Sequence, residues 1–135
     1  MVFKIQVIKD NKMENHVCIS FYLREAAIRI HRKTLDNINN PLFVRFLVSE
    51  DRKTFAVKSC AKKDLRSFRI RMNINSKTDK VEIYSSTLCA SLAKINGWDE
   101  NNSYRVYGKA FPNQGIAVFD FSETKAINNE VIGVE

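Results

Sequence analysis

Histidine and cysteine, the residue types that most often carry metal or nucleophilic chemistry, are few and widely spaced in this sequence. The cysteines are Cys18, Cys60 and Cys89, with no Cys-x-x-Cys pair, so neither a disulfide framework nor a four-cysteine metal site fits. His16 and Cys18 form a His-x-Cys pair, which supplies two ligands where zinc takes four. We therefore predict no metal site, and free thiols indicate a reducing, cytoplasmic setting.

The remaining catalytic signals are equally weak. His31 is followed by Arg32 and Lys33. This cationic neighbourhood suits a surface residue, or a hydrogen-bond donor to a phosphate, better than a general base. The four glycines are dispersed, so there is no glycine-rich phosphate loop. We predict that the protein is not an enzyme and uses no cofactor.

Basic residues, by contrast, are clustered. Between residues 52 and 71 the one acid among many cations is Asp64, and the pattern ends in Arg69 and Arg71, which alternate with Phe68 and Ile70. Arginines on one strand face could neutralise several phosphates of a nucleic acid. The alternative is a solvated sheet face, since soluble strands normally present charge to water. Alternation places Phe68 in the core.

The charge is also unequal between the halves of the chain. Of the 22 basic and 15 acidic residues, residues 1–71 hold 16 basic and 7 acidic, or +9, and residues 72–135 hold 6 and 8, or −2. The net charge of +7 favours anionic partners. We expect the first half to provide the positive surface.

Hydrophobic periodicity predicts mainly strands. Ser85 is a candidate N-cap for a helix with Leu88 and Leu92 on one face, and Gly97 is suited to end it. A short helix with Leu35 and Ile38 is expected before Pro41. The expected strands are 2–8, 17–23, 28–31, 42–48, 54–58, 68–74, 81–84, 104–107 and 115–121.

Two stretches of the chain echo each other. The run from Ile30 to Leu35 is answered by the run from Ile83 to Leu88, and each passes from strand to helical character. Val44-Arg45-Phe46 is answered by Tyr104-Arg105-Val106, and 55–57 by 116–118. We interpret residues 26–60 and 80–121 as duplicated strand-helix-strand-strand units.

This order of elements resembles the unit of AbrB-type transcription factors, which have swapped-hairpin barrels, and more loosely the halves of a double-psi β-barrel. The resemblance implies DNA contact at the strand-to-helix junctions, which in the first unit offer Arg29, Arg32 and Lys33 and in the second Glu82, Ser85 and Ser86.

The sequence thus predicts an α+β, mainly β fold. Residues 1–121 are expected to form a single small barrel domain with two short helices, and residues 122–135 a polar tail with little order. No stretch has the length of apolar residues that a membrane span needs.

The leading functional prediction is a module that binds DNA or RNA without catalysis. Its candidate phosphate contacts are Arg29, Arg32, Lys33, Arg69 and Arg71. The alternative is a protein-interaction or inhibitor module of a phage or mobile element, of the anti-CRISPR kind, that occupies a nucleic-acid-binding protein. Self-association into a homodimer is a third possibility.

Overall fold

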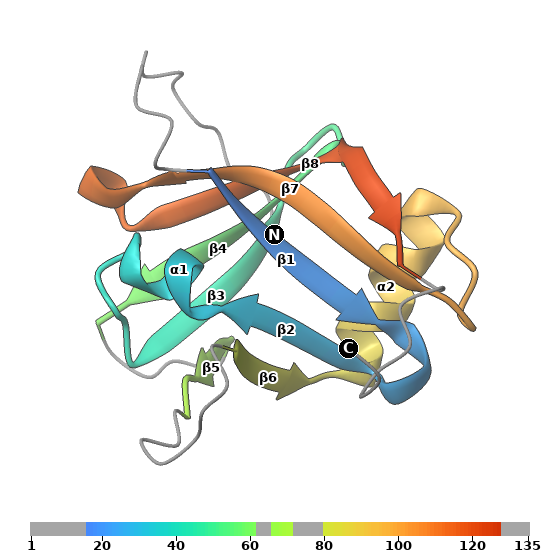
Figure 1. Cartoon of the computed structure of the whole chain (residues 1–135), viewed down its shortest axis with the longest axis horizontal. Helices are drawn as coiled ribbons and strands as arrows, with labels where there is room; N and C mark the ends of the chain where they lie inside the picture. Colours follow the sequence, from blue (N-terminus) through green and yellow to red (C-terminus); the bar gives the residue numbers. More distant parts are fainter. Residues whose placement is uncertain (1–15, 62–65, 72–79, 128–135) are drawn as a thin grey trace.

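Eight strands wrap into one nearly closed, barrel-like antiparallel sheet accompanied by two α-helices (Figure 1). This computed structural model describes residues 16–61, 66–71 and 80–127. The strands are β1 (His16–Tyr22), β2 (Ala27–His31), β3 (Phe43–Val48), β4 (Thr54–Cys60), β5 (Ser67–Arg69), β6 (Lys80–Tyr84), β7 (Ser103–Phe111) and β8 (Ile116–Ala126). Their order in the sheet is β5-β3-β4-β8-β7-β1-β2-β6. The predicted mainly β, barrel-like fold is confirmed at this level.

Strict alternation along the strands separates an apolar interior from the outer surface. Ile19, Ile30, Val57 and Val106 point inward and are fully buried. Phe21 and Phe55 meet edge to face at 5.6 Å between ring centroids, a geometry that aromatic pairs favour. Since successive strand residues face opposite sides, this packing fixes which residues lie outside.

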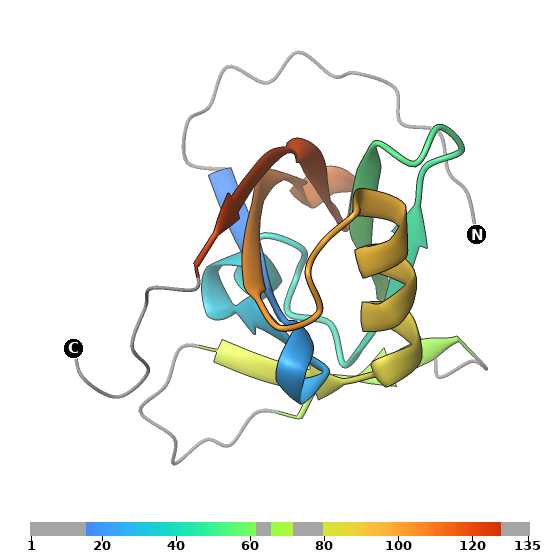
Figure 2. The ribbon, with the colours of Figure 1, turned by 90° about the vertical axis from the view of Figure 1, so that its right-hand side faces the viewer.

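Helix α2 (Ser86–Asn96) lies at the right-hand end of the barrel in Figure 1 and is viewed from that side in Figure 2. Its ends are those the sequence predicted. The Ser85 side chain accepts a hydrogen bond from the Leu88 amide at 3.2 Å, and Gly97 adopts the left-handed conformation with φ 65°. Trp98, just beyond, stacks on Tyr104 at 4.7 Å and ties the helix end to the sheet.

The shorter helices connect strands. Helix α1 (Arg32–Asp36) follows β2 directly, and buries Thr34 and Leu35. Two 3-10 turns, η2 (Leu23–Glu25) and η3 (Pro112–Gln114), join β1 to β2 and β7 to β8. None of the helices in the described residues is long and apolar enough to cross a bilayer.

Two predicted boundaries differ from the structure. Of the expected strand 68–74, the structure shows β5, which pairs with Phe43–Arg45 of β3. Phe68 packs against the core as predicted. Residues 72–74 and the expected strand 2–8 lie outside the described residues. The polar tail was placed too early, because β8 continues to Ala126 and Ile127 is buried. Glu123 and Lys125 are exposed there, while β7 supplies the hydrogen-bonding partner.

The β7–β8 pair contains an irregularity built on one glycine. Val106 pairs with Thr124, but Gly108 pairs with Phe119, so residues 120–123 of β8 stand opposite the single residue Tyr107. A Cβ on Gly108 would lie 1.9 Å from the Val118 carbonyl oxygen. No side chain larger than hydrogen fits that approach.

We predict that Gly108→Ala destabilises the fold by about 3 kcal/mol, because overpacking against backbone cannot be relieved by rotating a side chain. Denaturant unfolding measures this difference. Gly97→Ala is the matched control: open space surrounds that position and only its left-handed backbone is strained, so about 1 kcal/mol is expected. Equal losses for the two variants would contradict the close approach.

Candidate nucleic-acid interface

The outward-facing residues of β1, β2, β6 and β7 form a surface rich in positive charge. The register places Arg105 opposite Ser20, Arg29 opposite Glu82, and His16 opposite Lys109. We call the following set the cationic face: Arg29, Lys33, Lys80, Arg105, Lys109 and Lys125, with His16 and His31 between them.

One row of this face crosses five neighbouring strands. Lys125 of β8 pairs with Arg105, Arg105 with Ser20, Ser20 with Arg29, and Arg29 with Glu82. Adjacent strands are about 4.8 Å apart, so the row extends over about 19 Å. The buried Ser20 hydroxyl accepts a hydrogen bond from Nε of Arg105 at 3.1 Å, which fixes the guanidinium near the middle of the row.

Arg29 is held more firmly than a typical surface cation. Its Nε donates to Oε2 of Glu82 at 2.5 Å, and its Cζ lies 4.1 Å from the centre of the Tyr22 ring. Burial opposes the charge of the guanidinium, but the hydrogen bond to Glu82, the negative charge of Glu82 and the neighbouring Tyr22 outweigh it and raise its pKa. Arg29 therefore stays charged with its planar group fixed in place.

The balance of charge on the face is strongly positive. Glu82 is the one acidic residue in β1, β2, β6 and β7, and it is already engaged by Arg29. On β8, Glu123 is two residues from Lys125. Lys80, Lys109 and Lys125 are exposed and reach into solvent, which suits contacts with an anionic polymer.

Aromatic side chains border the cations. Tyr84 is 65% exposed and Tyr107 42%. Tyr104 is half-buried against Trp98. Exposed rings beside positive charge can stack on unpaired bases.

Cys18 lies opposite Tyr107 on the same face. Burial raises the pKa of its thiol, and the nearby charges of Arg105 and Lys33 only partly offset this. The thiol is therefore protonated and unreactive at neutral pH.

The five predicted contacts differ in their surroundings. Arg29 and Lys33 belong to the cationic face, Lys33 through its proximity to Cys18. Arg32 is half-buried, and its Nε has no hydrogen-bond partner within the described part of the chain. Arg69 and Arg71 are exposed at β5, which ends the strand order and lies beside β6, the other end, in the nearly closed barrel (Figure 1).

Half of the residues of the cationic face lie in residues 72–135, the acidic half of the chain. The sequence had predicted the positive surface in the first half instead. Lys80, Arg105, Lys109 and Lys125 are four of the six basic residues after residue 71. The signal was present as alternation, since Arg105, Tyr107 and Lys109 occupy every second position of one strand. Net charge over a long segment hides such a stripe.

In residues 16–61, 66–71 and 80–127, no three His, Cys, Asp or Glu side chains are grouped to hold a metal ion. Comparisons with known protein families, with characterised proteins and with solved structures found no match. The resemblance to AbrB-type factors therefore depends on the order of elements alone.

We predict a coupling of roughly 0.5–1 kcal/mol between Arg29 and Glu82, a modest value because both side chains are partly exposed. A double-mutant cycle with Arg29→Met and Glu82→Gln, followed by denaturant unfolding, measures it. Arg105→Met with Glu82→Gln is the control, since β1 and β2 separate these residues and their effects should add. Additive effects for Arg29 and Glu82 would contradict the ion pair.

Proposed function

We propose that this protein binds the phosphate backbone of DNA or RNA through the cationic face, without catalysis. The observation that carries the proposal is the row from Lys125 to Arg29, in which three cations on β8, β7 and β2, with Ser20 of β1 between the last two, are followed by one engaged acid, Glu82. Phosphate contacts of this kind position a nucleic acid and read little of its sequence.

The geometry supports an extended ligand rather than a small one. The cations from Lys125 to Arg29 span three strand intervals, or about 14 Å, and single-strand phosphates recur every few ångströms, so more than one can be contacted at once. Tyr84 and Tyr107 offer stacking at the margins. Arg29 and Arg105, each held by a neighbouring side chain, give up little conformational freedom on binding.

We predict that Lys109→Gln and Lys125→Gln each weaken binding and flatten its salt dependence. Each lost phosphate contact should reduce the slope of log K against log salt concentration by about one. Gel-shift titrations with single-stranded and duplex oligonucleotides at several salt concentrations measure both quantities. Lys53→Gln, in the β3–β4 turn, removes the same charge away from the face and is the control.

Arg69→Ala and Arg71→Ala belong in the same titration, because they test whether the β5 edge also contributes. Binding that is absent at low salt, indifferent to salt, or equally affected by Lys53→Gln would contradict the proposal.

We further propose that the barrel arose by internal duplication. From the β4–β8 pair outward, the order is β3 then β5 on one side and β7 then β1 on the other. The echo relates Ile30 to Ile83, which lies 53 residues later. If the same 53-residue shift is applied to the pair Ile28–Ile83, Ile28 becomes Val81 and Ile83 becomes Ile30, which gives the pair Val81–Ile30. Both pairs occur in the register, as expected for a two-fold axis through Arg29 and Glu82.

The β4–β8 register requires a change to the echo of 55–57 in 116–118. Carrying Val57 to Val118 would exchange the two faces of the sheet, because Val57 packs in the main core and Val118 packs against the outer cluster of Leu47, Ala56 and Ile116. A shift one residue longer carries Ala56 to its own partner Val118 and exchanges the pairs Phe55–Phe119 and Val57–Ala117, which keeps both faces. The same shift makes Lys109 the counterpart of Leu47.

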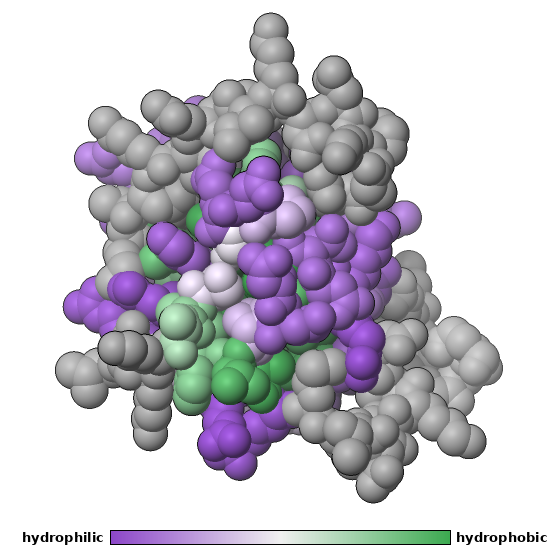
Figure 3. All heavy atoms as spheres, turned by 90° about the vertical axis from the view of Figure 1, so that its left-hand side faces the viewer, coloured by the Kyte–Doolittle hydropathy of each residue, from purple (hydrophilic) through white to green (hydrophobic). Residues whose placement is uncertain are grey.

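A second candidate function, a protein-interaction module, is favoured by the exposed apolar side chains. Leu42, just before β3, is 68% exposed. Figure 3 shows an apolar patch beside hydrophilic residues on the side of the molecule that is on the left in Figure 1. Purification with a specific protein and without nucleic acid, unaffected by Lys109→Gln, would favour this candidate. The same preparation, analysed by light scattering, would reveal a homodimer.

A further inference from the structure

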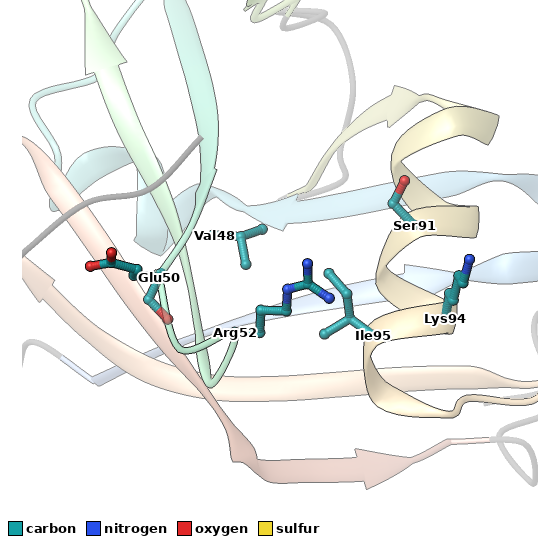
Figure 4. Close-up of a pocket in the computed structure, with 7 residues that line it drawn as sticks. Val48, Glu50, Arg52, Ser91, Lys94 and Ile95 are labelled. Carbon is teal, nitrogen blue, oxygen red and sulfur yellow. The ribbon is translucent and has the colours of Figure 1, made fainter.

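A groove lies between the β3–β4 turn and α2, on elements that do not contribute to the cationic face (Figure 4). Its volume is about 660 Å³, within the range of small-molecule sites. The lining residues are Val48, Ser49, Glu50, Arg52, Ser91, Lys94 and Ile95. The groove therefore combines two cations, two hydroxyls and an apolar wall.

Arg52 is directed into the groove by a tightly bonded turn. Its amide donates to the Ser49 carbonyl at 2.9 Å, and the Asp51 carboxylate accepts from the Ser49 hydroxyl and the Lys53 amide. Figure 4 shows the guanidinium extending between Val48 and Ile95, toward α2. The turn thus fixes the direction of the side chain from its base.

The backbone of Arg52 is left-handed, with φ 61°. Glycine is the favoured residue in this conformation, and a residue with a Cβ costs about 1 kcal/mol there. The strain is present at the position whose side chain enters the groove.

The two cations of the groove are not neutralised by the protein. Neither Arg52 nor Lys94 forms an ion pair with an acid of the described residues. Glu50 lines the same groove, but its carboxylate is directed away from Arg52 (Figure 4). A ligand that enters would therefore meet net positive charge.

We propose that this groove binds a phosphomonoester, with the phosphate between Arg52 and Lys94 and the attached organic group against Val48 and Ile95. The planar guanidinium can donate two parallel hydrogen bonds to phosphate oxygens, and the ammonium adds a point charge. The Ser91 hydroxyl lines the groove one turn before Lys94 and is a further donor. The charge of a dianion matches the two cations.

The phosphate has two possible sources with the same chemistry: a free small molecule, or the 5′-phosphate at the end of a nucleic-acid strand. The inference does not depend on the function proposed for the cationic face. Variants of Lys109 and Lys125 leave the groove intact, and variants of Arg52 leave the face intact, so the two proposals fail separately.

The test is titration of the full chain with phenyl phosphate, followed by amide chemical shifts in ¹H–¹⁵N NMR spectra. We predict saturable shifts centred on Arg52, Ser91 and Lys94, and at least about tenfold weaker binding for Arg52→Gly. Glycine relieves the left-handed strain, so this variant should fold at least as stably as the parent. Lys53→Ala removes one charge from the same turn and should bind as the parent does.

The pH dependence separates a phosphate from other anions. The second ionisation of a phosphomonoester has a pKa near 6, so affinity should rise between about pH 5 and pH 7.5, whereas phenylacetate should show no such rise. In parallel, a 5′-phosphorylated oligonucleotide is compared with its 5′-hydroxyl counterpart. Groove shifts with phenyl phosphate support a free ligand, and shifts only with the 5′-phosphorylated strand support a strand end.

Absence of groove shifts with both phosphate probes, or unchanged binding by Arg52→Gly, would overturn the inference. Equal, pH-independent shifts with phenylacetate would also overturn it, because the site would then be a general anion attractor.

Discussion

The structure depends on one constraint, the two-residue period of strands closed around an aromatic interior. Phe21, Phe55 and Phe119 are completely buried, and they fix the facing of β1, β4 and β8. Once those residues point inward, their neighbours along each strand must face outward. A slip of one residue in β7 would exchange Val106 for Arg105 in the core, and the cost of burying that charge excludes it.

The same constraint explains how a surface forms from residues far apart in the chain. Arg29 and Arg105 belong to segments with opposite net charge, yet β1 lies between β2 and β7 and places them in one row. Ser20 contributes by size and polarity, since its small buried hydroxyl anchors Arg105 where a larger side chain would push it away. The cationic face is thus a property of the sheet order, and no single segment contains it.

The two proposed binding regions differ in construction. The cationic face is broad and rests on regular strands, which suits a repeating polymer of phosphates. The groove between the β3–β4 turn and α2 is local and is built from a strained turn and a helix, so it can select one group by shape. Arg52 and Arg29 illustrate the contrast. Arg52 extends into the groove and forms no ion pair with an acid of the described residues, whereas Arg29 is held by Glu82 and Tyr22.

The sequence by itself determined the local features, because these depend on neighbouring residues. Ser85 and Gly97 marked both ends of α2, alternation identified most strands, and Phe68 was correctly assigned to the core. Only the tertiary structure decided which strands are adjacent, because hydrogen bonding between β2 and β6 or β4 and β8 joins residues dozens of positions apart. That adjacency brought Lys109 and Lys125 to the face and extended β8 through residues whose polarity had predicted a tail. Period and capping are encoded locally, whereas pairing is set by burial of the whole apolar surface at once.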